Sequence, residues 1–268
     1  MLNDMFTVAK ANKAQFPLNP RPDIEHWWAV VAMIASYNHV YQVTYKTKYE
    51  VHGPIGASIY GDAPIAPYQY EILALSMDTQ SVIDAVHAYP IKQDEKYIID
   101  AFHAQPSSPE LKQQYAQNGY EFIRTGPIFG IDLPTKSNTV PRNVHKATTI
   151  QQAETANHTL TTEGERIYTE TLRDKNIHSF YGTVGGEAVG WLQLVTVYPD
   201  VGYINQLYVL ESYRRRKFGM ALVQYAQLEA SKLGLKKIVL IPSAMSIPLY
   251  RRLGYYPLLY FSAFRLYK

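Results

Sequence analysis

The pattern of hydrophobic and polar positions changes from strand-like to helical within one short segment, residues 203–222. Between Ile204 and Val209 the residues alternate with a period of two and are rich in β-formers. From Phe218 onward apolar residues recur at helical spacing, at Phe218, Ala221, Leu222, Tyr225 and Leu228. The pattern therefore predicts a strand that leads through a turn directly into a helix.

The predicted turn is basic. Arg214, Arg215, Arg216 and Lys217 follow one another, and Gly219 lies in the first helical turn. A helix N-terminus exposes unpaired N–H groups and a partial positive charge, which favour an anion such as pyrophosphate. The small glycine lets a ligand approach the backbone closely. This turn is therefore the candidate anion-binding site.

Other interpretations of the basic turn stay open. The patterns GxxxxGK[ST] and GxGxxG are both absent, so the turn is neither a Walker P-loop nor a dinucleotide fingerprint. Four consecutive basic residues also suit a solvated helix start or a nucleic-acid patch. The order of the surrounding elements favours the anion site.

Residues 214–219 resemble the motif [QR]xxGx[GA] of the GNAT superfamily of acyl-CoA-dependent N-acyltransferases, which also joins a strand to a helix. Lys217 departs from it, because it stands at the first glycine of the motif. In that family backbone N–H groups bind the pyrophosphate, so a Lys217 side chain that points to solvent is compatible with binding.

A second segment, SIPLYRRLGYYPL, is similar to the family's AxxLYxxxGF. Leu249, Tyr250, Gly254 and Tyr255 match in spacing, and Ser243 stands where many members have asparagine. The resemblance covers about residues 146 to 268.

The resemblance implies an α+β fold, a mixed and mostly antiparallel sheet flanked by helices. It implies acetyl-CoA as co-substrate, a primary amine of a small molecule or peptide as acceptor, and direct transfer in a ternary complex. Tyr250 matches the family's general acid. The implied cofactor-binding residues are Leu207, Tyr208, Val209, Arg214, Arg215, Arg216, Lys217, Phe218, Gly219, Met220 and Ser243.

The general base stays unassigned. Family members often carry an acidic residue on the strand before the basic turn, whereas this strand has Asn205 and Gln206. Glu211 is interpreted as a solvated charge or an arginine partner. A water chain from a backbone carbonyl or Asn205 is an equal alternative. The missing base also keeps a non-catalytic acyl-CoA sensor or assembly module open as a second function.

The N-terminal half shows a related order of elements. A helix is predicted from Asp23, with Trp27, Val30, Val31 and Ile34 on one face, followed by a strand over 40–51. Residues 96–123 and 236–260 then share a strand, a loop, a helix with Tyr115 or Tyr250, and a turn at Gly119 or Gly254. We interpret the N-terminal half as a degenerate copy that binds no anion, although any α/β domain can repeat such elements.

The predicted domains are residues 1–133, a linker over 134–145, and residues 146–268. The linker is polar and contains two prolines. Beyond it, two helices are predicted over 147–160 and 161–175, the second with a capping box at Thr162 and Glu165. Gly185-Gly186 predicts a β-hairpin.

Composition narrows the function further. The 268 residues carry a net charge of +3, too low without clustering elsewhere to favour nucleic acid. The sequence has no cysteine, and its eight histidines show no metal-ligand spacing. No apolar run is long enough for a membrane span, and no signal peptide is evident. We expect a cytoplasmic protein without a metal, a membrane or a nucleic-acid partner, and leave a homodimer open.

Overall fold

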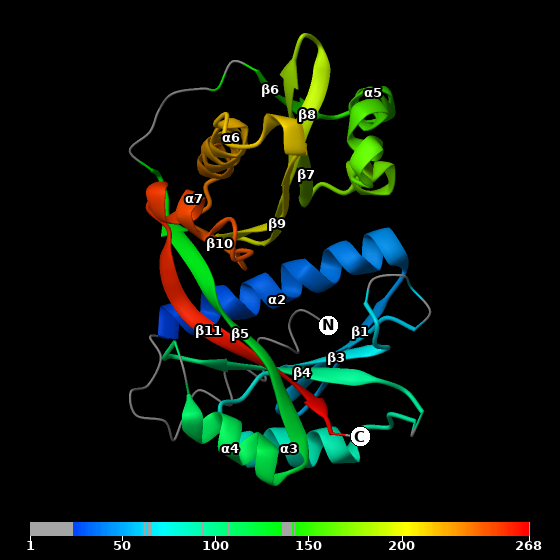
Figure 1. Ribbon diagram of the computed structural model, residues 1–268, viewed down its shortest axis with the longest axis vertical. Helices are drawn as coiled ribbons and strands as arrows, with labels where there is room; N and C mark the ends of the chain where they lie inside the picture. Colours follow the sequence, from blue (N-terminus) through cyan, green and yellow to red (C-terminus); the bar gives the residue numbers. More distant parts are fainter. Residues whose placement is uncertain are drawn as a thin grey trace. The chain divides into compact units, whose positions relative to one another are not determined.

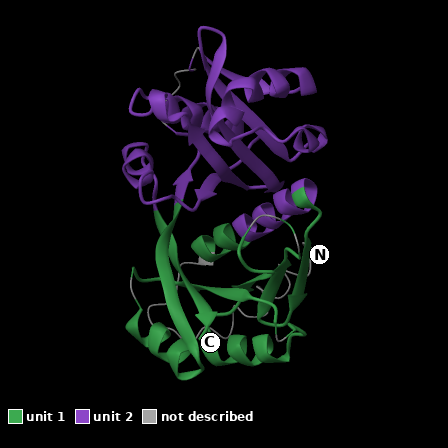
Figure 2. Cartoon of the chain, turned by 45° about the vertical axis from the view of Figure 1, so that its right-hand side comes forward, with its two compact units in different colours: residues 1–31, 45–129, 257–268 green, residues 32–44, 130–256 purple. Residues whose placement is uncertain are grey.

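The computed structural model describes residues 24–61, 63, 66–92, 94–106, 108–135, 141 and 143–267, so the predicted cap Asp23 lies outside them. The chain divides into two compact units (Figure 2). Unit 1 takes residues 1–31, 45–129 and 257–268, and unit 2 takes 32–44 and 130–256. This division differs from the domains predicted from sequence, because residues 257–268 group with unit 1, and residues 32–44 and 130–133 group with unit 2.

Unit 1 is built on strands in the order β1-β2-β3-β4-β11-β5. The strands are β1 (Lys48–His52), β2 (Ile55–Ile59), β3 (Tyr70–Ala74), β4 (Tyr97–His103), β5 (Tyr120–Asp132) and β11 (Tyr256–Leu266). β3 and β4 are parallel, whereas β1 with β2, β2 with β3, and β4 with β11 are antiparallel. The sheet is therefore mixed, as the resemblance implied.

Helices α3 (Thr79–Ala88) and α4 (Pro109–Gln117) contribute to one core cluster of unit 1 (Figure 1). Ser108 caps α4 by accepting a hydrogen bond from the Leu111 N–H, and Pro109 occupies the first turn, where a missing N–H costs little. Tyr115 of α4 stacks on Phe264 of β11 with ring centroids 4.0 Å apart. The last strand of the chain thereby completes the core of unit 1.

Unit 2 places its strands in the order β6-β7-β8-β9-β10, with β5 next to β10. The strands are β6 (Val144–Ala147), β7 (Ile177–Val184), β8 (Glu187–Tyr198), β9 (Val201–Val209) and β10 (Lys237–Leu240). The predicted hairpin at Gly185-Gly186 is confirmed, since both glycines adopt positive φ between β7 and β8.

Helices α5 (Ile150–Leu160) and α6 (Phe218–Lys232) lie on opposite faces of this sheet (Figure 1). Trp191 of β8 belongs to the core cluster that contains Ala153 and Ala156 of α5. Phe180 of β7 contacts Tyr225 of α6 edge-on, at 5.3 Å between centroids. Because successive side chains of a strand point to opposite faces of the sheet, one face packs against α5 and the other against α6.

Two element predictions are wrong. The strand over 40–51 is helical up to Tyr45, because α2 (Ile24–Tyr45) continues, and only β1 is extended. The helix over 161–175 is replaced by the short 3₁₀ turns η2 (Thr161–Glu163) and η3 (Thr169–Arg173), separated by Gly164 at φ +77°. A capping box does form, but at Thr149 and Gln152 of α5.

The buried face predicted for α2 is confirmed: Trp27, Val30, Val31 and Ile34 are all at most 2% exposed. None of the described helices is both long and apolar enough to cross a membrane.

Candidate functional site

Strands β9 and β10 separate at the point where the predicted turn begins. Their parallel pairing covers only Val201–Tyr203 and Lys237–Val239, although β9 continues to Val209. On the other side of β9, the register with β8 shifts between the pairs Gln193–Gln206 and Leu194–Ile204, which leaves Asn205 as an extra residue. Such a bulge bends the strand. The edge of β9 that would face β10 is therefore without a strand partner in the described residues beyond Tyr203.

The turn that follows contains two residues in the left-handed region. Arg215 has φ +60° and Lys217, the residue before α6, has φ +69°. Lys217 therefore has a left-handed backbone conformation, which a glycine adopts without strain. The cost for an L-residue is about 1–2 kcal/mol. Successive N–H groups in such turns form concave anion-binding nests.

The side chains of Arg215, Arg216 and Lys217 are exposed, whereas Arg214 holds the turn together. Its Nε donates to the Val209 carbonyl at 3.1 Å, and its Nη2 to the Tyr208 hydroxyl at 3.3 Å. Tyr208 in turn donates to Glu163 at 2.6 Å, which raises the pKa of Tyr208. Two of the predicted cofactor-binding side chains thus stabilise the turn itself.

Glu163 connects this turn to the segment after α5. Its carboxylate also accepts the backbone N–H of Glu211 at 3.1 Å, and the hydrogen bond from Tyr208 lowers the pKa of Glu163. Glu211 itself is exposed at the start of the 3₁₀ turn η4 (Glu211–Tyr213). No local sequence pattern indicated Glu163, because its partners lie 45 and 48 residues away along the chain.

The first turn of α6 meets β9 and α7 (Ile247–Arg252) at Gly219. A Cβ added there would lie 3.4 Å from Leu249 Cδ2, 3.8 Å from Val209 Cγ2 and 4.0 Å from Leu207 Cδ2. These are ordinary contact distances, so alanine fits, whereas a branched side chain would press on all three neighbours. Phe218 packs edge-on against Tyr213 at 6.0 Å, and Met220 is half-buried.

Tyr250 lies on α7 and is 3% exposed, with its ring edge-on to Tyr255 at 5.2 Å. Burial raises the pKa of Tyr250, so its phenol stays protonated at neutral pH. Its hydroxyl makes no hydrogen bond within the described part of the chain. Ser243 is exposed, and its hydroxyl donates to the Ser246 hydroxyl at 3.0 Å in the loop before α7.

A row of polar side chains crosses the sheet beside the bulge, and most of these side chains were not predicted as site residues. Ser179 of β7, Gln193 of β8 and Gln206 of β9 are register partners, and Asn205 donates to Gln193 Oε1 at 2.9 Å. Ser179 Oγ and Gln193 Nε2 are buried without a partner among the described residues. Buried orphan polar atoms call for water or a ligand. The signal in the sequence was Gln193, a polar residue in an otherwise apolar strand.

The described histidines have structural partners where they are buried. His103 contacts the Gln105 carbonyl at 2.7 Å and the Ser262 hydroxyl at 2.8 Å, and burial lowers its pKa. Over the described ranges, no three His, Cys, Asp or Glu side chains cluster as a metal site.

Comparison with known proteins identifies the class of domain. Residues 145–255 match the model of the acetyltransferase (GNAT) family. The chain therefore carries a GNAT acetyltransferase domain over these residues and is an acyltransferase. No curated protein matches the chain.

Similarity to solved structures extends over both halves. A GCN5-related N-acetyltransferase from Kribbella flavida is 17% identical, with 87% of this chain and 95% of that chain covered and a TM-score of 0.63. A tandem GNAT protein from the clavulanic acid biosynthesis pathway is 14% identical, with coverages of 90% and 93% and a TM-score of 0.55. At these identities the likeness concerns the fold, and the expected GNAT-like α+β fold is confirmed.

Proposed function

We propose that the chain is an acetyl-CoA-dependent N-acetyltransferase that acts on a primary amine by direct transfer within a ternary complex. The observation that carries the proposal is the separation of β9 from β10 where a basic, left-handed turn opens into α6. This arrangement offers backbone donors and positive charge at one place, as a pyrophosphate requires.

Acetyl-CoA would be held mainly by backbone. N–H groups from Arg215 to Met220 would face the pyrophosphate, and the exposed Arg215, Arg216 and Lys217 side chains would add charge. The edge of β9 from Leu207 to Val209 would bind the amide-containing arm of coenzyme A by strand-like hydrogen bonds. Ser243, in the loop before α7, would lie beside that arm.

In the reaction, the neutral amine nitrogen attacks the thioester carbonyl, the C–N bond forms, and the C–S bond breaks. An alkyl amine has a pKa near 10.4, so a proton must leave the nitrogen. Water held by Asn205, Gln193 and Ser179 would accept it, because two of these groups have orphan polar atoms. Tyr250 would give its phenolic proton to the departing thiolate.

The test is release of free thiol from acetyl-CoA in the presence of a panel of small-molecule and peptide amines, together with calorimetry. We expect amine-dependent thiol release and one acetyl-CoA per chain. Two equivalent sites would contradict the assignment of the site to unit 2 alone.

A second candidate function is a non-catalytic acyl-CoA sensor. Two observations favour it: the strand before the turn has no acidic residue, and Lys217 replaces the glycine of the motif. A sensor would bind acetyl-CoA with the same stoichiometry but release no thiol with any amine, so the two assays together distinguish the functions.

A further inference from the structure

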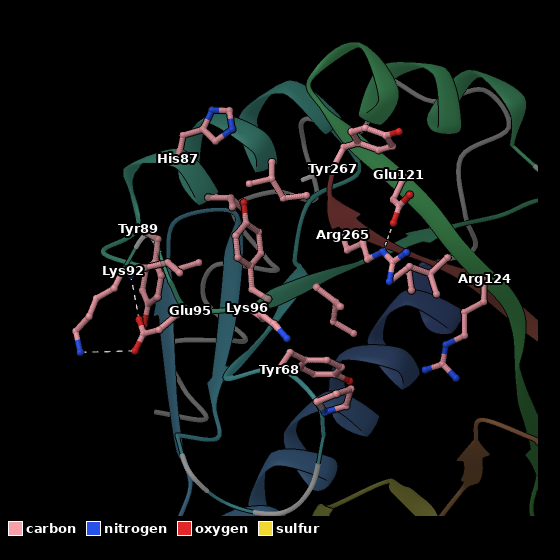
Figure 3. Close-up of a pocket in the computed structure, with 18 residues that line it drawn as sticks. Tyr68, His87, Tyr89, Lys92, Glu95, Lys96, Glu121, Arg124, Arg265 and Tyr267 are labelled. Carbon is pink, nitrogen blue, oxygen red and sulfur yellow. Dashed lines mark hydrogen bonds and ion pairs between the residues drawn. The ribbon is translucent and has the colours of Figure 1, made fainter.

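Unit 1 contains a cavity of about 1090 Å³ that the proposed reaction does not use (Figure 3). Its lining comes from the C-terminal end of α3, the start of β4, and parts of β5 and β11, all within unit 1. Sites for small molecules have volumes of about 300–1,000 Å³, so the cavity is large enough for one.

The walls of this cavity are largely apolar. They include Val86, Ile91, Ile98, Ile123, Ala263 and Leu266. Ile123 is 42% exposed and Leu266 is 44% exposed, although both are large hydrophobic side chains. Exposed apolar side chains that gather in a concavity indicate a surface that gains free energy when a ligand covers it.

Cationic side chains outnumber carboxylates in the lining of this cavity. It holds four Lys or Arg side chains, Lys92, Lys96, Arg124 and Arg265, and two carboxylates, Glu95 and Glu121. Both carboxylates are engaged. Glu121 is paired with Arg265, and Glu95 accepts from the Tyr70 hydroxyl at 3.0 Å and lies 3.7 Å from Lys92 Nζ.

Lys96 and Arg124 remain without a carboxylate in salt-bridge contact among the described residues. Arg124 lies over the Phe261 ring at 5.3 Å, and a buried acid close to it is Asp100. Burial and the neighbouring Glu71 raise the pKa of Asp100 well above its usual range, which favours the uncharged form of this carboxyl. Figure 3 shows that the two cations lie apart: Lys96 is close to Glu95 and Tyr68, whereas Arg124 is at the other side of the lining.

We propose that this cavity binds an apolar organic anion. Its hydrophobic body would lie against Ile98, Ile123 and Leu266, and its acidic group would be bound by Lys96. Unit 1 would thereby be a ligand-binding unit in its own right, rather than only a degenerate copy of unit 2. The proposal does not depend on the acyl-transfer function.

The test uses two fluorescent probes with one ring skeleton, 8-anilinonaphthalene-1-sulfonate and the uncharged N-phenyl-1-naphthylamine, on the full chain. We expect the sulfonate to bind more tightly. The variant Lys96→Gln should weaken sulfonate binding about tenfold, as loss of a charge-assisted hydrogen bond implies, and leave the neutral probe within about twofold. Lys112→Gln, an equal charge change in unit 1 outside the lining, should change neither.

A second variant tests the apolar wall. Ile123→Glu places a carboxylate in the cavity at a partly exposed position, so the fold should be kept, and unchanged circular dichroism would show this. We expect sulfonate binding to be lost. Equal affinities for the two probes, or parental sulfonate affinity in the Lys96→Gln variant, would overturn the proposal.

Discussion

The two halves of the chain repeat one order of elements. β3-α3-β4-α4-β5 in the first half corresponds to β9-α6-β10-α7-β11 in the second. In each, two parallel strands pair over only three or four residues, 70–73 with 97–100 and 201–203 with 237–239. Each second helix carries a buried tyrosine, Tyr115 or Tyr250, and ends before a left-handed glycine, Gly119 or Gly254.

The units differ in the turn between the first strand and the first helix. In unit 2 the turn spans residues 210–217 and contains four basic side chains, whereas in unit 1 it spans only 75–78. Asp78 stands at the N-cap of α3, where a negative charge repels an anion. The cavity that Thr79, at the start of α3, lines together with His103 and Tyr115 measures about 230 Å³, less than the volume of about 300–1,000 Å³ of small-molecule sites. We therefore expect that the length and charge of this turn decide whether a pyrophosphate binds at the start of the helix.

The largest expected effect comes from the two equivalent tyrosines. Tyr250→Phe removes only a hydroxyl, and loss of one general acid should lower kcat about 10²-fold with little change in KM for acetyl-CoA. Tyr115→Phe is the matched control, because Tyr115 is equally buried but belongs to the unit without the basic turn. Steady-state kinetics of both variants checks this.

Turnover of Tyr250→Phe within about twofold of the parent from pH 7 to 9 would assign the acid to water or another residue. Tyr250 would then have a packing role, which would show as a lower melting temperature.

The second largest expected effect is a loss of acetyl-CoA affinity on substitution of Gly219. Gly219→Ala adds a Cβ at ordinary contact distances, whereas Gly219→Val adds methyl groups toward Leu249 and Val209, where the start of α6 would receive the pyrophosphate. We expect Val to weaken acetyl-CoA binding about tenfold or more, and Ala less than about threefold. Calorimetry on folded protein measures both affinities. Unchanged affinity in Gly219→Val would remove Gly219 from the site.

The sequence predicted most elements near the candidate site because periodicity is a local property. The strand up to Val209, the helix from Phe218 and the hairpin at Gly185-Gly186 all follow from residues within one segment. The helix prediction for residues 161–175 was wrong for two reasons. Gly164 interrupts the helical pattern, and Glu165 accepts a hydrogen bond from the Trp191 indole N–H at 3.1 Å. Long-range contacts of this kind leave no periodic signal.

The exchange of strands between the halves could not be predicted for the same reason. β11 pairs with β4, although about 150 residues separate them, and hydrophobic alternation does not encode which strand is the neighbour. The polar row at Ser179, Gln193 and Gln206 likewise depends on register between three strands.

The units should also respond to pH in opposite directions. In unit 2, burial lowers the pKa of His178 to about 4, so the unfolded chain binds the proton more readily and stability falls as pH drops from about 6.5 toward 4. In unit 1, the pKa of Asp100 is raised, so the folded state binds this proton more readily than the unfolded chain does. Asp100 therefore stabilises the folded state at low pH, and this contribution is lost as pH rises. Lys146, Glu229 and Asp174 act on His178, and Glu71 and Arg124 act on Asp100.

Urea unfolding at pH 7 and pH 5 checks the contrast. From pH 7 to pH 5, the free energy of unfolding of the parent should fall by about 1–2 kcal/mol more than that of His178→Gln, after allowance for partial solvent screening. Asp100→Asn should change stability in the opposite sense, with its gain greatest at high pH. Parallel pH dependence of the parent and His178→Gln would show that another group governs acid stability.

The smallest effect concerns the residue that departs from the family motif. Lys217 has φ +69°, and its side chain is exposed, so replacement by glycine removes an exposed side chain and its positive charge. Lys217→Gly should relieve backbone strain and raise the free energy of unfolding by about 1 kcal/mol. Lys232→Gly, in the last turn of α6, is the control, because that residue is helical and glycine there should cost about 1 kcal/mol.

Acetyl-CoA affinity of Lys217→Gly should stay within about threefold of the parent if backbone N–H groups bind the pyrophosphate, since one exposed charge contributes little. A tenfold loss would instead assign the lysine side chain a direct role, and unit 2 would then bind its anion through a charge that replaces the motif's glycine.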